Sequence, residues 1–402
     1  MKKINVKTLK PGLIFSHPVF IEGDNFLVPA NIPLRQKDID QLVAWGIKEV
    51  ETDGDIVEDE EFPVDDIFEE DDSSVSGGGR ESARTSNVKA SQFSLKEVKE
   101  NKGPYRAYKS LIDKLDVVYN NIMGSVSVES RTIDNICTQL IQELRDHRDS
   151  FIVFILGGEV SGQELAKSSV NTAILSALTA QELKLANHKI LQIVTAALLH
   201  DAGMLKLPRE IINKKGGLSD SELEIMKSHP NFAAKIVTKE LFYPQEVALI
   251  VQQHHERWDG KGYPDHISGT SIDMGARIVS VADAFEAMVS HKSYRNSMDG
   301  YQAMKNLLSD NSRRFDPVVL KAYAKIMGIY PIGSIVLLNN GAYARVTEVH
   351  NDASLRPKIN MLIDEFGNAF KGNEGEIIDL LNEKKLFIIK AVDPKEFAST
   401  NA

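Results

Sequence analysis

Helical periodicity over most of residues 92–325 constrains the fold of this chain more than any other feature. Apolar residues recur at helical spacing over 108–119, 133–144 and 190–198. Between Ser161 and Lys325 the pattern is almost entirely helical. Such spacing is typical of helices that bury one face. The sequence therefore predicts a mainly α protein with a helical central domain.

Two small modules are predicted beside the helices. Residues 1–52 indicate strands at 13–20, 25–28 and 49–51 and a helix at 37–45, which favours a small α+β regulatory module. After Pro331 the apolar period changes to two, and Asn340-Gly341 reads as a tight hairpin turn. Residues 329–395 are therefore expected to form a small β module.

The segment over residues 53–91 lacks the composition needed for a core. From Glu51 to Asp72 every charged residue is acidic, and 73–91 is rich in Ser and Gly. Such composition is typical of disorder. We expect a disordered linker over 53–91, a helical region over 92–150 and the central domain over 151–328.

Composition narrows the function classes. No apolar run reaches the roughly 20 residues that span a bilayer, and the N-terminus lacks the apolar core of a signal peptide, so we expect no membrane association and a cytoplasmic protein. The net charge of −10 argues against broad nucleic-acid binding. Cys137 is the only cysteine, which excludes a disulfide framework and a thiolate zinc site. Any metal must be held by His and carboxylate groups.

A set of histidines and aspartates carries the strongest chemical signal. His200-Asp201 ends the apolar stripe over 190–198 and is expected to point toward the core. A lone pair of this kind could simply satisfy each other by hydrogen bonding. Further candidates follow at predicted helix ends or on packed faces, namely His229, His254, His255 and Asp283. Four histidines and two aspartates fit a two-metal site bridged by a carboxylate.

The run from His254 to Pro264 reads His-His-Glu-Arg-Trp-Asp-Gly-Lys-Gly-Tyr-Pro, and it is followed by Ala276–Asp283 and by Ser293-Tyr294-Arg295. Over about residues 161–325 the chain resembles the HD-GYP family, a branch of the HD phosphohydrolase superfamily. The resemblance implies a helical HD-type domain. It also implies metal-dependent hydrolysis of the bacterial second messenger cyclic di-GMP to the linear dinucleotide, with GMP as a further product.

The resemblance also implies roles for the metal-binding residues. His200 and Asp201 would bind metal and take part in catalysis, with Asp201 as the bridge and Asp283 closing one site. His229, His254 and His255 would complete the second site. Two divalent ions are expected, iron or manganese first, although such donors also accept nickel or zinc.

For the substrate, the resemblance implies contacts from Gly262, Tyr263, Lys292 and Arg295. Tyr263 could stack on or hydrogen-bond the nucleotide, or simply pack the loop. Lys292 and Arg295 would contact ligand phosphates, or remain solvated surface charges. A diguanylate cyclase or another signalling protein could dock on the GYP surface, and a homodimer is also expected.

Two positions depart from the family pattern. Ser168 stands where the family usually has a metal-binding His, so the site of His200, Asp201 and Asp283 should bind metal more weakly. Glu164, four residues earlier, could compensate or be an exposed helix-surface residue. Met204 replaces a lysine expected near the scissile phosphate, and Lys206 could reach that place only if a loop redirects it.

These features leave two functions open. Retention of the six metal-binding positions and of the GYP loop favours a phosphodiesterase with slow or metal-demanding turnover. Ser168 and Met204 favour a degenerate domain that acts as a cyclic di-GMP receptor or docks a partner without significant turnover. We favour the enzyme and keep the receptor as the alternative.

Overall fold

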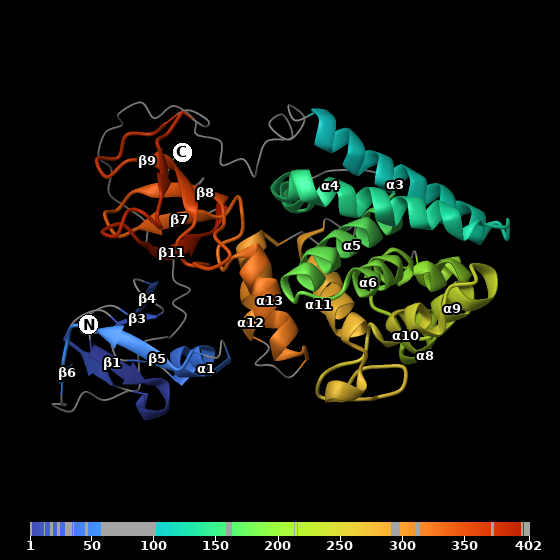
Figure 1. The fold of residues 1–402 in the computed structure, drawn as a ribbon, viewed down its shortest axis with the longest axis horizontal. Helices are drawn as coiled ribbons and strands as arrows, with labels where there is room; N and C mark the ends of the chain where they lie inside the picture. Colours follow the sequence, from blue (N-terminus) through green and yellow to red (C-terminus); the bar gives the residue numbers. More distant parts are fainter. Residues whose placement is uncertain are drawn as a thin grey trace.

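The computed structural model describes residues 2–57, 102–157, 163–394 and 397, apart from short gaps at 12, 17–18, 22–24, 29–33, 35, 45–46, 213, 215, 291–297, 310–313 and 371–373. A mainly helical body is accompanied by two small β-containing modules (Figure 1). This confirms the fold class that the sequence predicts. Most of the predicted linker, residues 58–91, lies outside the described residues.

The N-terminal module is a small antiparallel sheet with one helix. Four of its strands pair in the order β1-β5-β3-β4, while β2 pairs separately with β6. The elements are β1 (Lys2–Asn5), η1 (Val6–Thr8), β2 (Ile14–Phe15), β3 (Val19–Ile21), β4 (Asn25–Val28), α1 (Gln36–Ala44), β5 (Glu49–Thr52) and β6 (Ile56–Val57). Phe15, Val19, Leu42 and Val50 belong to its buried core.

The sequence does not predict two of these strands. β1 carries two exposed lysines, so it lacks an alternating apolar signal. β6 falls inside the range predicted as a linker. Its residues, Ile56-Val57, are an apolar β-branched pair, but the acidic run around them hides this signal. It pairs with β2, with Ile14 opposite Val57 and Phe15 opposite Ile56. The module therefore extends at least to residue 57.

The helical body contains long helices joined by short turns. In chain order they are α3 (Lys102–Met123), α4 (Ser130–Gly157), α5 (Glu164–Glu182), α6 (Asn187–Leu199), η2 (Ala202–Lys206), α7 (Arg209–Ile212), α8 (Asp220–Met226), α9 (His229–Lys235), η3 (Ile236–Glu240), α10 (Gln245–Gln253), η4 (Gly269–Ser271), α11 (Met274–Val289), α12 (Gly300–Ser309) and α13 (Pro317–Met327). One hydrophobic core joins their buried residues.

The boundary expected between residues 150 and 151 falls inside α4. This helix bends at His147, whose φ of −134° is not helical, and then continues to Gly157. Phe151 and Phe154 pack against Tyr108 of α3 with ring centroids 5.8 and 5.5 Å apart. The predicted helical region and the central domain therefore share one core.

α5 lies at the centre of the body, because nearly every residue from Ala166 to Ala180 is buried. A helix that is buried around most of its circumference must be covered by other elements on all sides. α6 and α11 pack extensively against it, and α10 packs against α6, α9 and α11 (Figure 1). This arrangement brings the end of α6, the start of α9, the end of α10 and the middle of α11 together.

Close backbone approach fixes the turn after α6. A Cβ on Gly203 would lie 2.0 Å from the carbonyl oxygen of His229 and 2.6 Å from the amide nitrogen of Ala233. Only glycine leaves room for η2 to contact α9 at this point. Gly203 therefore brings the chain directly after Asp201 against the helix that begins with His229.

The C-terminal module is an antiparallel sheet with the order β10-β9-β8-β7-β11. Its strands are β7 (Ile335–Leu338), β8 (Tyr343–Glu348), β9 (Lys358–Ile363), β10 (Ile377–Asp379) and β11 (Ile388–Val392). The predicted Asn340-Gly341 turn is confirmed, with Gly341 at a φ of 86° and its amide 3.0 Å from the carbonyl of Leu338. The sequence does not predict β10, which is three residues long.

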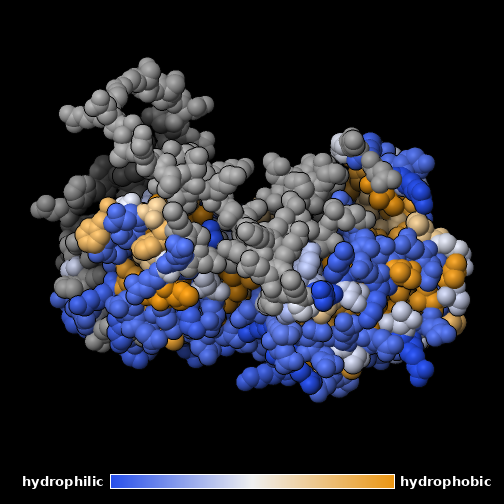
Figure 2. All heavy atoms as spheres, turned by 90° about the horizontal axis from the view of Figure 1, so that it is seen from above, coloured by the Kyte–Doolittle hydropathy of each residue, from blue (hydrophilic) through white to orange (hydrophobic). Residues whose placement is uncertain are grey.

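The surface seen from above is mainly hydrophilic, and its apolar areas are separated by polar residues (Figure 2). Within the described part of the chain, no helix has the length and hydropathy needed to cross a membrane.

Candidate metal centre

Asp201 lies in the middle of the predicted cluster, with one carboxylate oxygen facing each half. Its Oδ1 is 3.3 Å from Nε2 of His229, and its Oδ2 is 3.4 Å from Nε2 of His200. Nε2 of His200 is also 3.5 Å from Oδ1 of Asp283. A carboxylate that offers separate oxygens to two sets of donors is well arranged to bridge two cations.

Three of the histidines are oriented by the same local device. His200 directly follows α6, His254 directly follows α10, and His229 begins α9 three residues after the end of α8. In each, Nδ1 donates to the backbone carbonyl three residues earlier, at 2.7, 2.6 and 2.7 Å. The last carbonyls of a helix lack intrahelical partners, so the histidine satisfies one of them. Nε2 is thereby left free to bind a metal.

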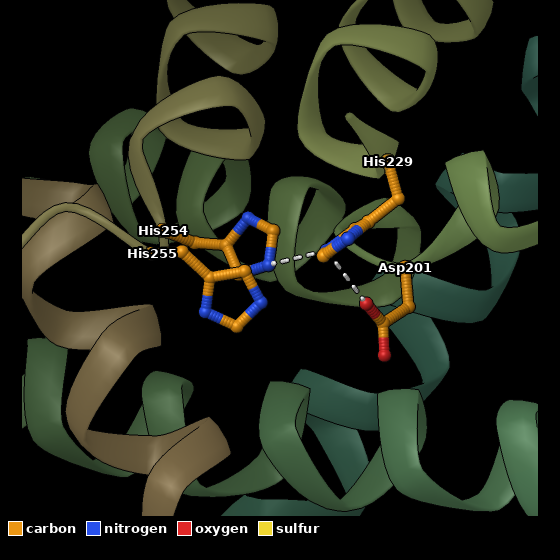
Figure 3. Close-up of side chains that lie close together, drawn as sticks. All are labelled: Asp201, His229, His254 and His255. Atoms are coloured by element: carbon orange, nitrogen blue, oxygen red, sulfur yellow. Dashed lines mark hydrogen bonds and ion pairs between the residues drawn. The ribbon is translucent and has the colours of Figure 1, made fainter. Parts of the chain in front are cut away.

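The second half of the cluster has the geometry of a metal site. One ligand atom from each of Asp201, His229, His254 and His255 lies within 4.8 Å of the other three, and these side chains point toward one another (Figure 3). His254 and His255 are consecutive residues, and the centroids of their rings are 4.0 Å apart. The structure thus brings together the residues predicted for this half.

The donors of both halves fit divalent cations. Nε2 of His200 is fully buried and forms no hydrogen bond. Nε2 of His229 and Nε2 of His254 are 3.4 Å apart, although both rings already donate from Nδ1. Two neutral imidazoles then face each other with acceptors only, an arrangement that a shared cation satisfies. Nitrogen and carboxylate donors without thiolate suit iron, manganese, nickel or zinc.

The local electrostatics differ between the two halves. Burial alone would lower the pKa of His200, but Asp201 and Asp283 raise it well above its usual value. Burial lowers the pKa of His255 to about 4. The charge of Asp283 opposes this shift, whereas His229 and His200 add to it. Burial and the three neighbouring histidines lower the pKa of His254. Burial alone would raise the pKa of Asp201, but the surrounding histidines hold it well below its usual value. Neutral imidazole and ionised carboxylate are the forms that bind metal.

The GYP loop closes over the His255 side of the cluster. The ring of Tyr263 lies 4.8 Å from the ring of His255, and the amide of Tyr263 donates to the carbonyl of His255 at 3.2 Å. A Cβ on Gly262 would lie 2.5 Å from that same carbonyl and 2.3 Å from the amide nitrogen of Arg257. Gly262 therefore permits the close turn that places Tyr263 beside the cluster.

The other predicted contacts are placed differently. Ser168 does not turn to the cluster; its hydroxyl donates to Oε2 of Glu286 at 2.6 Å. Glu164 is exposed in the first turn of α5 and is not gathered into the cluster. Lys206 contacts the carbonyl of Ile122 and forms an ion pair with Glu240 at 3.5 Å, so it does not replace the lysine missing at Met204.

The phosphate contacts predicted at Lys292 and Arg295 lie outside the described residues. The sequence analysis also missed a residue next to the cluster. Glu286 lies one turn after Asp283 on α11 and is almost fully buried. Its position one turn from a predicted ligand, on a helix of mainly apolar and small residues, was a usable signal.

Known protein families match two parts of this chain. A family model described as an HD domain matches residues 159–319, and one described as a KOW domain associated with HD domain matches 335–400. A relative named cyclic di-GMP phosphodiesterase PdeB, from Borreliella burgdorferi, is 26% identical over 74% of this chain and 78% of its own length. A cyclic di-GMP phosphodiesterase from Pseudomonas aeruginosa is 34% identical over 48% of this chain and 46% of its own.

A third relative is named for a different substrate. It is a 3'3'-cGAMP-specific phosphodiesterase from Vibrio cholerae, 29% identical over 47% of this chain and 36% of its own length. The chain therefore spans less than half of the second and third relatives. Residues 159–319 therefore match an HD domain, and these relatives and the motif from His254 to Pro264 support the resemblance of this region to the HD-GYP family.

Proposed function

We propose that this chain hydrolyses cyclic di-GMP to the linear dinucleotide at a two-metal centre bridged by Asp201. The main support is the position of Asp201, which directs one carboxylate oxygen to each of two sets of donors. One set contains His200 and Asp283. The other contains His229, His254 and His255. The names of the relatives support cyclic di-GMP as the substrate. GMP as a further product stays a prediction.

The residues of the site would have separate roles in this reaction. Asp201 would hold both cations, and His200, His229 and His254, whose Nδ1 atoms already form hydrogen bonds, would bind through Nε2. Two divalent ions bound there would lower the pKa of a shared water and neutralise phosphate oxygens. The scissile phosphodiester would lie across the Asp201 carboxylate, and Tyr263, beside His255, is placed to stack on the neighbouring base. No protein nucleophile is required.

The substrate is tested by a panel of cyclic dinucleotides. Purified protein is loaded with Mn²⁺, or with Fe²⁺ without oxygen, and given cyclic di-GMP, 3'3'-cGAMP or cyclic di-AMP, and the products are separated by chromatography. We expect linear product from cyclic di-GMP at the highest rate. A faster reaction with either of the other two would reassign the substrate while leaving the metal chemistry intact.

A receptor without turnover is the second candidate function. The observation that favours it is the contact of Ser168 with Glu286, which leaves the His200 half without a fourth protein donor from α5. Met204 likewise supplies no cation. Tight binding of intact cyclic di-GMP with both cations present and no product would establish the receptor. Partner docking at the GYP surface and a homodimer remain predictions for either function.

Gly262→Ala is expected to weaken substrate handling. The new Cβ would meet backbone atoms at 2.3–2.5 Å, so the loop must move and Tyr263 with it. We expect kcat/KM to fall about 10²-fold, as for misplacement of about 1 Å, and stability to fall by about 1–3 kcal/mol. Gly217→Ala is the matched control, since a Cβ there meets nothing within 4 Å. Equal kinetics for the two variants would contradict this role of the loop.

Tyr263→Ala is expected to raise KM with little change in bound metal. Stacking of an aromatic ring on a base contributes about 1–3 kcal/mol, which corresponds to roughly a 5- to 150-fold increase in KM. Tyr263→Phe keeps the ring and should lose much less. Steady-state kinetics with metal analysis distinguish the contributions, and a loss as large in Phe as in Ala would assign the contact to the hydroxyl instead.

A further inference from the structure

Glu286 is a buried carboxylate that the proposed mechanism does not use. It lies three residues after Asp283 on α11, and 1% of its surface is exposed. Residues three apart on a helix are neighbours on one face, with Cβ atoms about 5–6 Å apart. Glu286 therefore lies next to the Asp283 side of the candidate centre.

The hydrogen bonds to Glu286 come from neutral donors. Ser168 donates to Oε2 at 2.6 Å, and Asn171 Nδ2 donates to Oε1 at 3.1 Å, as does the Ser290 hydroxyl. Tyr108 donates to Oδ1 of Asn171 at 2.7 Å, which orients the amide so that Nδ2 faces Glu286. In all three contacts the carboxyl group of Glu286 is the acceptor.

No protein cation forms an ion pair with this carboxylate within the described ranges. Burying a charge without a counter-charge is unfavourable even when its hydrogen bonds are satisfied. Burial first, and then the charge of Glu286, raise the pKa of Tyr108 and of Tyr323, whose hydroxyl is buried without a partner. One turn earlier on the same helix lies Asp283, which belongs to the candidate centre.

We infer that Glu286 is the outer counter-charge of a divalent cation held by His200, Asp201 and Asp283. Nε2 of His200 lies 3.4 Å from Oδ2 of Asp201 and 3.5 Å from Oδ1 of Asp283, so three metal-binding side chains face one another in this half. This half has no imidazole from α5, because Ser168 instead holds Glu286 in place. The buried charge would partly replace the lost ligand through its field. The inference rests on the proposed two-metal centre.

The test uses Glu286→Gln, which removes the charge and nearly keeps the shape. The full chain is stripped of metal with a chelator and titrated with Mn²⁺, while bound metal and thermal unfolding are followed. We expect metal-free Glu286→Gln to unfold at a higher temperature than metal-free wild type, because an uncompensated buried charge is gone. The second equivalent of Mn²⁺ should bind about tenfold more weakly, with the first unchanged.

Two control variants separate charge from hydrogen bonding. Ser168→Ala removes one hydrogen bond and keeps the charge, so it should lower the unfolding temperature of the metal-free protein and leave both affinities within about twofold of wild type. Glu246→Gln changes an exposed residue of α10 and should alter neither quantity. If Glu286→Gln does not fold, Glu286→Met is used instead, because it also removes the charge and has a similar volume. The same results are expected for it: a higher unfolding temperature without metal and weaker binding of the second equivalent of Mn²⁺.

A metal-free Glu286→Gln protein that is less stable than wild type, with unchanged Mn²⁺ affinities, would overturn the inference and make Glu286 a structural hydrogen-bond acceptor. The proposed function fails by a different result, which is the absence of linear dinucleotide when metal is fully bound. The two failures are therefore distinguishable.

Discussion

Asp201→Asn is expected to lower the hydrolysis of cyclic di-GMP by about 10³-fold or more. The two oxygens of Asp201 face Nε2 of His229 at 3.3 Å and Nε2 of His200 at 3.4 Å. Asparagine keeps one acceptor oxygen, and its NH₂ group has no lone pair to offer a cation. One cation loses a ligand and the bridge is broken, which removes stabilisation of the developing charge.

Metal analysis of Asp201→Asn tests the same account without turnover. Bound metal should fall below one equivalent under conditions that load wild type. Asp220→Asn, at an exposed position in the first turn of α8, is the matched control and should keep both metal and rate. Full activity of Asp201→Asn would rule out Asp201 as the bridge.

The double variant Ser168→His with Met204→Lys is expected to raise hydrolysis about 10²-fold or more. Restoring a cationic donor near a reacting phosphate typically changes rates by about 10²–10³. An imidazole at position 168 would supply the ligand that the HD-GYP resemblance expects. Oε2 of Glu286, now 2.6 Å from the Ser168 hydroxyl, is placed to accept the other ring N–H and orient the imidazole.

Single variants show which change matters. Ser168→Ala adds no ligand and should give no gain in rate, whereas Ser168→His alone should increase bound metal. The contradictory result is a double variant that folds, binds two cations and turns over no faster than wild type. That outcome would favour the receptor over the enzyme.

The local features of the site could be read from the sequence because they depend on neighbouring residues. The apolar stripe before His200 predicts a helix that ends in the core, and the structure has this arrangement. Ser219 and Glu222 form a capping box at the start of α8, a motif that the local sequence pattern indicates. His229 is at the start of α9 rather than at the end of α8, a difference of a few residues that the sequence pattern does not resolve.

Tertiary contacts account for most of what the sequence did not reveal. Ser168 and Glu286 are 118 residues apart, and nothing local indicates that one hydroxyl turns away from the metal cluster to meet a buried carboxylate. The small strands β1, β6 and β10 form through pairing with distant strands rather than through their own patterns. The roles of Lys292 and Arg295 rest on the family resemblance alone.

The most direct test of the central claim follows bound metal and product together. Metal-free wild type is titrated with Mn²⁺ in the presence of cyclic di-GMP, and linear dinucleotide is quantified at each point beside bound metal. The proposed centre predicts little product at one equivalent and a rise in rate as the second, weaker site fills. Saturation of both sites with cyclic di-GMP bound and intact would contradict it, because a two-metal centre bridged by Asp201 would then be present without the chemistry assigned to it.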